Sequence, residues 1–245
     1  MTDAPRSVSV VIPALHEAEG IGATLASVLR QSGPVEVVVV DGGSTDGTAD
    51  AARDAAPGAL VLKSAPGRAQ QMMRGAEAAS GDVLLFLHAD THLPAGALDA
   101  LRAALADPSV VGGCFRTTFD LDAGAAPFGP LGRAFMRLWE GRLWMQWHRF
   151  AFGDRALFAR RPAFDAAGGF PAQPLFEDLD FVRALRQRGR FVFLDAAVTT
   201  SARRFRRHGA LRQQLRNFAL WAGWNAGVAP ARLKRYYDDR PGLRG

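Results

Sequence analysis

Short apolar runs bounded by turn residues recur through the first half of the chain. They cover residues 7–12, 35–40, 59–62 and 83–87. Continuous apolar runs of this length are typical of strands that are buried on both faces of a parallel sheet. The segments between them carry apolar residues at helical spacing, as at Ile21, Leu25 and Val28. We therefore predict an α/β fold built on a Rossmann-like, doubly wound and mostly parallel sheet.

The pattern becomes less regular beyond residue 120. A helix is predicted around residues 98–105, and a longer strand over residues 110–121 leads out of the wound region. After it, the pattern predicts strands at residues 156–158 and 191–194, helices at residues 177–188 and 207–227, and a polar surface tail from Pro230. The length of 245 residues suits one compact domain with a helical C-terminal extension.

Charge is distributed unequally between the two parts of the chain. Residues 1–120 contain 8 Lys and Arg against 14 Asp and Glu, a net charge of −6, whereas residues 121–245 contain 22 against 10, a net charge of +12. Arginine supplies nearly all of the positive charge, and it suits bidentate contacts with phosphate or carboxylate. The basic half is compatible with a phosphorylated small molecule, an anionic membrane surface, a nucleic acid or a plain solvated face.

Cysteine content and hydropathy narrow the cellular setting. Cys114 is the single cysteine, so the chain cannot form an internal disulfide, and no Cys/His cluster has zinc-ligand spacing. Residues 1–6 do not resemble a signal peptide, and the apolar run at residues 218–230 is shorter than the ~20 residues of a membrane-spanning helix. We therefore expect a cytoplasmic protein, with peripheral membrane contact left open.

Acidic residues follow the predicted strands, at the edge of the sheet where open α/β proteins bind ligands. Glu17 comes shortly after the first strand, Asp41 directly ends the second, and Asp90 follows the fourth. Asp46 and Thr48 are suited to capping the next helix. A carboxylate at position 41 is placed to accept hydrogen bonds from a ribose hydroxyl or a base N–H, so we assign Asp41 to nucleoside binding, with a helix cap as the alternative.

The usual phosphate-binding loops are missing from the sequence. It has no Walker A segment and no Gly-x-Gly-x-x-Gly after the first strand, which excludes the standard mononucleotide and dinucleotide sites. A diphosphate can instead be held by Mg²⁺ or Mn²⁺, which prefer oxygen ligands from one or two carboxylates and from the phosphates. Asp90 is the natural protein ligand for such an ion.

Four motifs occur in order along the chain. They are Val10-Val11-Ile12-Pro13 with Glu17, Val39-Val40-Asp41-Gly42-Gly43-Ser44-Thr45-Asp46-Gly47-Thr48, Phe86-Leu87-His88-Ala89-Asp90, and Gly168-Gly169-Phe170 followed by Glu177-Asp178-Leu179-Asp180. Together they resemble glycosyltransferase family 2, with the GT-A fold, over most of the chain. The resemblance implies that Asp41 contacts the nucleotide base or ribose, that the segment ending in Asp90 binds the metal diphosphate, and that Asp178 is the catalytic base.

Two positions depart from the pattern of that family. Gly42 stands where many members have a second acid, and His88 replaces the first Asp of Asp-x-Asp. His88 could ligate the ion, hydrogen-bond a coordinated water, touch the nucleotide or orient a neighbour, so it is a second candidate metal ligand. Residues 88–91 and 67–72 also resemble a small subgroup labelled arsenosugar biosynthesis glycosyltransferase.

Basic residues at two places are candidates for contact with a diphosphate. Arg68 follows Gly67 at the start of a helix, where the cation and the helix dipole both face an anion, with ordinary helix-start chemistry as the alternative. A dense run at residues 203–208 precedes Gln213-Gln214-Leu215-Arg216, which resembles part of the Gln-x-x-Arg-Trp element of processive family members. We interpret the run as a diphosphate clamp and assign Arg204 to donor binding, with a solvated face as the alternative.

Aromatic residues in the segment 139–152 are assigned to the acceptor side, because aromatic faces stack on sugars and other flat apolar groups. A core or dimer helix and an amphipathic membrane-surface helix are the alternatives. The predicted acceptor-binding residues are Trp144, Phe152, Gly169 and Glu177.

Three acids within four residues open the helix predicted from residue 177. Glu177 and Asp180 can share a helix face, so we expect Asp178 to project separately into the cleft as the general base. First-turn acids that stabilise the helix dipole are the alternative.

These features predict an inverting glycosyltransferase, in which a deprotonated acceptor hydroxyl attacks the anomeric carbon and the nucleoside diphosphate leaves. Residues 1–120 are interpreted as its donor-binding half, and residues 121–245 as the acceptor-binding and C-terminal helical half of the same domain. The predicted donor site comprises Pro13, Leu15, Glu17, Asp41, Arg68, His88, Ala89, Asp90 and Arg204.

The expected partners are a UDP- or GDP-type nucleotide sugar, Mg²⁺ or Mn²⁺ and an acceptor of unknown identity, without nucleic acid. A nucleotidyltransferase on the same type of sheet and a non-catalytic nucleotide- or anion-binding protein are the alternative functions. The sequence does not define the oligomeric state.

Overall fold

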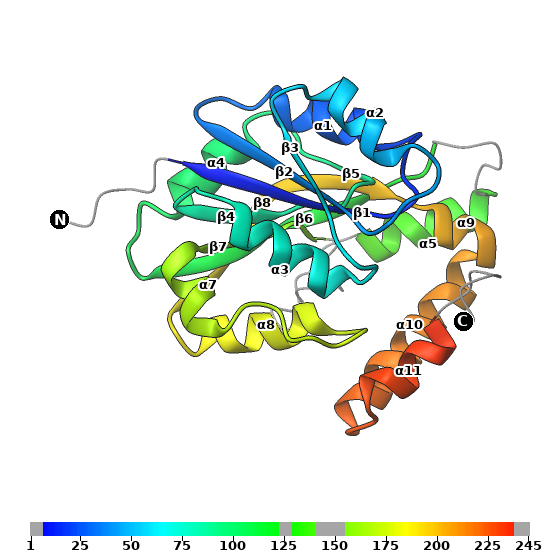
Figure 1. The fold of residues 1–245 in the computed structure, drawn as a ribbon. Coiled ribbons are helices and arrows are strands. Elements are labelled where there is room, and N and C mark those ends of the chain that lie inside the picture. The colour runs from blue at the N-terminus through cyan, green and yellow to red at the C-terminus, as the bar shows by residue number, and fades with distance from the viewer. Residues whose placement is uncertain (1–6, 123–128, 141–154, 238–245) are drawn as a thin grey trace.

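One eight-stranded sheet forms the centre of the molecule. A computed structural model describes residues 7–122, 129–140 and 155–237. The strands lie in the order β3-β2-β1-β4-β7-β6-β8-β5, with helices on both sides (Figure 1). They are β1 (Val8–Ala14), β2 (Val35–Asp41), β3 (Leu60–Lys63), β4 (Val83–Phe86), β5 (Thr91–His92), β6 (Val110–Asp120), β7 (Leu157–Arg160) and β8 (Arg190–Ser201).

The first four strands are all parallel to one another. β7 is antiparallel to β4 and β6, β8 is parallel to β6, and β5 is antiparallel to β8. The predicted α/β fold with a mostly parallel sheet is therefore confirmed. The sheet also crosses position 120, since β7 and β8 pair with strands from the first half. The division of labour between the two halves stays a prediction.

Ten helices are seen in the described part of the chain. They are α1 (Ile21–Leu29), α2 (Thr48–Ala55), α3 (Arg68–Ala78), α4 (Ala97–Ala104), α5 (Pro130–Glu140), α7 (Arg161–Ala167), α8 (Glu177–Arg186), α9 (Arg203–His208), α10 (Ala210–Asn225) and α11 (Pro230–Tyr237). Because successive strand residues point to opposite faces of the sheet, β1 contributes side chains to a hydrophobic core on each face. Val10 and Ile12 pack with α1, α2 and α4, whereas Val11 packs with α3, α7 and α8.

Three expectations for the second half are wrong in extent. The strand predicted at residues 191–194 continues to Ser201, where β8 pairs with the whole length of β6. The helix predicted over residues 207–227 is interrupted at Gly209, whose φ of 81° lies outside the helical region. The tail predicted from Pro230 begins with α11, whose Leu233 is buried. Pro230 suits a first helical position because proline needs no backbone donor there.

The C-terminal helices α10 and α11 form the predicted helical extension (Figure 1). Their Leu220 and Leu233 pack with Phe176 and Leu179 at the start of α8. No helix in the described ranges is both long enough and apolar enough to cross a membrane. The extension is thus joined to the body of the protein next to the acidic segment 177–180.

Helix α3 lies unusually close to the sheet. A Cβ atom added at Gly75 would overlap the Val11 side chain and lie 3.1 Å from Val40 Cγ2. Any larger residue at this position would push α3 away from β1 and β2. The absence of a side chain at position 75 therefore sets the distance between this helix and the two strands.

This packing gives a prediction with opposite signs for two helical glycines. Replacing glycine by alanine in a helix favours folding by up to about 1 kcal/mol, whereas overpacking a core costs about 1–3 kcal/mol. A Cβ atom at Gly22 in α1 would make an ordinary 3.8 Å contact with Ala55. We expect Gly22→Ala to stabilise the protein and Gly75→Ala to destabilise it, as measured by urea unfolding. Equal effects of the two substitutions would contradict the close approach of α3.

Candidate active site

Hydrogen bonds join the loop that follows β1 to the loop that follows β2. The backbone N–H of His16 donates to Ser44 Oγ at 2.9 Å, and that of Glu17 donates to Thr48 Oγ1 at 2.9 Å. The buried carboxylate of Asp41 accepts hydrogen bonds from both the backbone N–H and the hydroxyl of Ser44. Asp41 is therefore held in place where β2 ends, as the sequence predicted for its position.

The predicted capping by Asp46 and Thr48 is wrong in position, because Gly47 is the N-cap of α2 and Thr48 is its first residue. The Asp46 carboxylate accepts hydrogen bonds from the backbone N–H and the hydroxyl of Thr48, and from the backbone N–H of Ala18. These bonds hold the pKa of Asp46 below its usual value, the Thr48 hydroxyl bond being the largest cause. Asp46 thus supports the loop and the start of the helix.

Glu17 and Asp90 converge on one cation of the protein. The Arg203 guanidinium donates to both carboxylate oxygens of Glu17, at 2.6 and 2.8 Å, and to Asp90 Oδ2 at 3.2 Å. β8 brings Arg203 there, because the backbone N–H of Ser201 donates to the carbonyl oxygen of Asp90 at 3.1 Å. Partial burial lowers the pKa of Arg203, but its bonds with Glu17 and Asp90 outweigh that effect and raise it overall.

A second ion-pair cluster lies at the start of α8. The Arg68 guanidinium donates through Nε to Glu177 and approaches Asp178 Oδ2 at 3.5 Å. Glu177 is only 1% exposed and Asp178 only 3%. Two buried carboxylates this close together need a cation, and Arg68 supplies it from the first turn of α3.

The expected orientation of these acids is wrong in one respect. Asp178 does not project separately from Glu177, because both acids contact Arg68. Asp180 instead accepts a hydrogen bond from Gln173 at 2.8 Å and pairs with Arg183 at 3.3 Å. Helical spacing alone misled the prediction, since the long guanidinium offers different nitrogens to two adjacent residues. Asp178 as the general base stays a prediction.

Phe176 fixes the direction in which the acidic pair emerges. Its φ of 64° lies in the left-handed region, which is uncommon for a residue with a side chain. The buried ring packs against Trp224 of α10, with the ring centroids 5.3 Å apart. Strained backbone of this kind persists where the surrounding packing enforces it, and it often occurs at functional sites.

His88 makes a small electrostatic contribution to the pKa of Glu177. Burial raises the pKa of the Glu177 carboxyl, but the charge of Arg68 and its hydrogen bond outweigh this, with a smaller contribution from His88. The pKa of Glu177 is therefore below its ordinary value, and the carboxylate is ionised at neutral pH. In the sequence, His88 stands two residues before Asp90.

Gln71 was missed as a site residue by the sequence analysis. Its buried side-chain amide donates to the carbonyl oxygens of Ala14 at 2.7 Å and Val40 at 2.9 Å. These carbonyls belong to the carboxyl ends of β1 and β2. A Cβ atom at Gly42 would lie 3.0 Å from the amide carbon of Gln71. The space beside Gly42, where many family members carry a second acid, is filled by Gln71.

The remaining predicted residues are distributed as follows. Pro13 and Leu15 are half-buried at and just after the end of β1, and the buried Ala89 accepts a hydrogen bond from Thr24 through its carbonyl oxygen. Gly169 ends the segment after α7 with a φ of 65° and lies against Met73 of α3. Arg204 stacks on Tyr237 of α11 at 4.5 Å, while its neighbour Arg203 reaches the acids. Trp144 and Phe152 lie outside the described residues.

Metal binding was tested against the donor set around Asp90. Within residues 7–122, 129–140 and 155–237, no three His, Cys, Asp or Glu side chains gather as a ready metal cage. Mg²⁺ and Mn²⁺ bound to a diphosphate need only one or two protein carboxylates, however. Glu17 and Asp90 already bind one cationic group between them. The residues present thus fit an ion whose other ligands come from a diphosphate.

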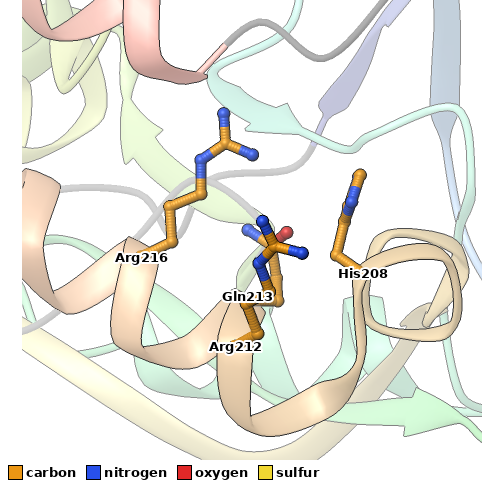
Figure 2. A pocket seen from close by; sticks show the side chains of 4 residues that line it. All are labelled: His208, Arg212, Gln213 and Arg216. Atoms are coloured by element: carbon orange, nitrogen blue, oxygen red, sulfur yellow. The ribbon is translucent and has the colours of Figure 1, made fainter.

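A basic cleft of about 380 Å³ lies beside α9 and α10. It is lined by His208, Arg212, Gln213 and Arg216, and Figure 2 shows the two Arg side chains and His208 extending to the same side of α10. Gln213 donates to Asn217 Oδ1 at 2.8 Å. Asn217, which stands where processive members have Trp, therefore orients Gln213 within this cleft.

Comparisons with known proteins agree with the motifs. The model of the family "Glycosyl transferase family 2" matches residues 9–161. A "PGL/p-HBAD biosynthesis glycosyltransferase" of Mycobacterium bovis is 43% identical over 91 residues, which are 35% of this chain and 36% of that protein. An "Uncharacterized glycosyltransferase" of Mycobacterium tuberculosis is 39% identical over 92 residues, 36% of this chain and 35% of the relative. The chain thus matches about a third of the length of these curated relatives.

Two solved structures share the fold. Residues 1–349 of TarS from S. aureus superpose with a TM-score of 0.62 at 19% identity, covering 80% of this chain and 60% of that one. The mannosyltransferase PcManGT from Pyrobaculum calidifontis, solved with GDP-Man and Mn²⁺, superposes with a TM-score of 0.58 at 24% identity, covering 81% and 57%. These likenesses confirm the predicted GT-A fold.

The family match spans more than half of the chain and contains the strand-end motifs that hold Asp41 and Asp90. This protein therefore belongs to glycosyltransferase family 2.

Proposed function

We propose that this protein is an inverting, metal-dependent glycosyltransferase that uses a UDP- or GDP-type nucleotide sugar. The observation that carries the proposal is the arrangement of four acids around one sheet. Arg68 binds the buried carboxylates of Glu177 and Asp178 on α8, while Asp41 ends β2 and Asp90 follows β4. TarS has been solved with UDP and with UDP-GlcNAc, and PcManGT with GDP-Man, which supports the donor class.

The nucleoside is assigned to the fastened loops after β1 and β2. Asp41 accepts hydrogen bonds from Ser44, and a carboxylate has further lone pairs for a ribose hydroxyl or base N–H. Pro13 and Leu15 form the neighbouring wall. Gln71 is a positioning residue in this assignment, because it ties the carbonyl oxygens at the ends of both strands.

The diphosphate is assigned to the end of β4. Asp90 would hold a metal ion together with the donor phosphates, and His88 and Ala89 belong to the same turn. Glu17 fixes Arg203 beside Asp90. A bound Mg²⁺ or Mn²⁺ would supply charge stabilisation to the leaving diphosphate. Arg203 adds cationic charge from the protein, and Arg204 and the basic cleft extend the positive surface along α9 and α10. In this proposal Arg203, rather than Arg204, is the main cation of the predicted diphosphate clamp.

Asp178 is assigned as the general base and Glu177, with Gly169, to the acceptor side. Asp178 removes the proton from an acceptor hydroxyl, whose oxygen then bonds to the anomeric carbon as the bond to the diphosphate oxygen breaks. One displacement inverts the configuration at that carbon. Arg68 keeps the neighbouring acid ionised, and the backbone N–H of Leu179 donates to Asp178 at 2.8 Å. The hydrogen bond from Leu179 holds the Asp178 carboxylate in place.

Two other functions are weaker fits. A nucleotidyltransferase would carry a Gly- and Lys/Arg-rich loop after β1, and residues 13–20 contain none. A non-catalytic nucleotide- or anion-binding protein would not require two acids buried against Arg68. Metal-stimulated release of nucleoside diphosphate from a sugar nucleotide without acceptor separates these functions, because only the transferase hydrolyses its donor slowly. Membership of the subgroup labelled arsenosugar biosynthesis and a cytoplasmic location remain part of the proposal.

Substitutions at Asp90 and Asp41 separate the proposed metal and nucleoside roles. Asp90→Ala should abolish the Mn²⁺-dependent rise in melting temperature caused by nucleoside diphosphate, since ligand binding to the native state is what stabilises it. Asp41→Ala should weaken nucleoside and nucleotide alike, with or without Mn²⁺. Metal-dependent stabilisation that survives in Asp90→Ala, or loss confined to diphosphates in Asp41→Ala, would overturn the respective assignment.

The contact between Gly42 and Gln71 can be tested by a double-mutant cycle. Gly42→Asp should weaken nucleoside diphosphate binding, because the new side chain meets the Gln71 amide 3.0 Å from its first carbon. Gln71→Ala in the same chain should restore part of that loss, as expected for residues in contact, whose coupling energies are about 0.5–3 kcal/mol. Gln70→Ala, at the exposed neighbouring position, is the matched control. Strictly additive titration-calorimetry affinities for Gly42→Asp and Gln71→Ala would refute the contact.

The general-base role proposed for Asp178 is tested by removing the charge of its side chain. Asp178→Asn should preserve folding and donor affinity while lowering turnover by ~10² or more, because a general base contributes about 10²–10⁴ to the rate. Asp180→Asn is the control, since Asp180 bonds to Gln173 and Arg183 outside the buried pair. Turnover close to wild type in Asp178→Asn would remove this residue from the mechanism.

A further inference from the structure

Exposed large apolar side chains are concentrated on two helices of the basic half. Among the described residues eight such side chains are exposed, and five of them belong to α5 and α10. They are Leu131 and Leu138 on α5, and Leu211, Leu215 and Phe218 on α10. The two helices contact each other near the start of α10. Isolated exposed apolar residues are ordinary, but a concentration of this kind marks an interaction surface.

On α10 these residues form one stripe. Leu211, Leu215 and Phe218 follow each other at spacings of four and three, which places them on one face of a helix. They are 59%, 62% and 54% exposed, whereas Gln213 and Leu220 on the other side of α10 are buried. The helix is therefore packed against the protein on one side and presents an apolar face on the other.

The α5 helix repeats this arrangement. Leu131 and Leu138 lie two turns apart, with the exposed Ala134 between them. Met136 faces the opposite way and is completely buried in a cluster with Phe205 and Ala210. The internal packing of α5 is thus satisfied without its exposed leucines.

Arginines border both apolar stripes. Arg212 and Arg216 lie along one flank of the α10 stripe, and Arg137 lies beside Leu138 on α5. Residues 121–245 carry a net charge of +12. A partner that covers the stripes must therefore accept apolar side chains and carry negative charge around them. A second copy of the chain is a poor match, because a twofold interface would place the same basic surface against itself.

We propose that the exposed faces of α5 and α10 dock on an anionic lipid bilayer. The leucines and Phe218 enter the boundary between head groups and acyl chains, and the exposed Arg137 and Arg212 face the lipid phosphates. Helices with an apolar face bordered by arginine bind membranes in this way without crossing them. The proposal goes beyond sugar transfer and requires neither a donor nor an acceptor.

The test is sedimentation with phosphatidylcholine vesicles, with and without phosphatidylserine, at ionic strengths below and above ~0.15 M. We expect binding to the anionic vesicles to exceed binding to the neutral vesicles by about tenfold or more at low salt, and to weaken as salt is added. Absence of binding to anionic vesicles would overturn the proposal.

A pair of double variants locates the surface. Leu215→Ser with Phe218→Ser should lower vesicle binding by about tenfold or more, because both side chains lose their burial in lipid. Leu29→Ser with Leu60→Ser is the matched control, since these exposed leucines lie on α1 and β3, and it should bind like the wild type. Circular dichroism melting checks that all variants fold.

The remaining outcomes also decide the matter. Equal loss of vesicle binding in both double variants, or full binding by the α10 variant, would show that the stripe is not the docking surface. A dimer in light scattering that Leu215→Ser with Phe218→Ser converts to a monomer would assign the surface to a second copy instead.

Discussion

The close approach of α3 to the sheet is the constraint on which the candidate site depends. Gly75 lets the helix lie directly on Val11 and Val40. Because Gln71 and Arg68 lie one and two turns earlier on the same helix, their positions follow from that contact. Gln71 then reaches the strand-end carbonyls, and Arg68 reaches the acids of α8. One helix thereby fixes the relation between the loops after β1 and β2 and Asp178.

Charge balance explains why the acids are stable so close together. Buried carboxylates are expensive unless a cation and hydrogen bonds compensate them. Arg68 compensates Glu177 and Asp178, and Arg203 compensates Glu17 and Asp90. Each arginine pairs with acids from the other half of the chain: Arg68 lies in residues 1–120 and Arg203 in residues 121–245. The two clusters therefore join the first half of the chain to the second.

Much of the first half could be predicted because local patterns determine it. Continuous apolar runs define buried parallel strands, and an acid directly after such a run must lie at the ligand-binding edge, as Asp41 does. The contact between Arg68 and Glu177 could not be read in this way, since it joins residues 109 positions apart. Arg203 and Arg204 are chemically identical neighbours, and only the path of β8 decides which one reaches Asp90. Gln71 was inside a noted motif, but its role depends on the empty space at Gly42.

The C-terminal helices were the hardest part to predict, and they act on the site through packing. The sequence 207–227 has one continuous helical period, yet Gly209 divides it and lets α9 and α10 take different directions. Trp224 of α10 then packs on Phe176 and also lies 3.9 Å from the Arg183 guanidinium. Because Phe176 immediately precedes Glu177, any force that shifts α10 is transmitted to the backbone that carries the buried acids. The left-handed backbone of Phe176 and the contact of its ring with Trp224 therefore occur at the same residue. The helical extension is therefore part of the architecture of the candidate site, even though it contributes no strand to the sheet.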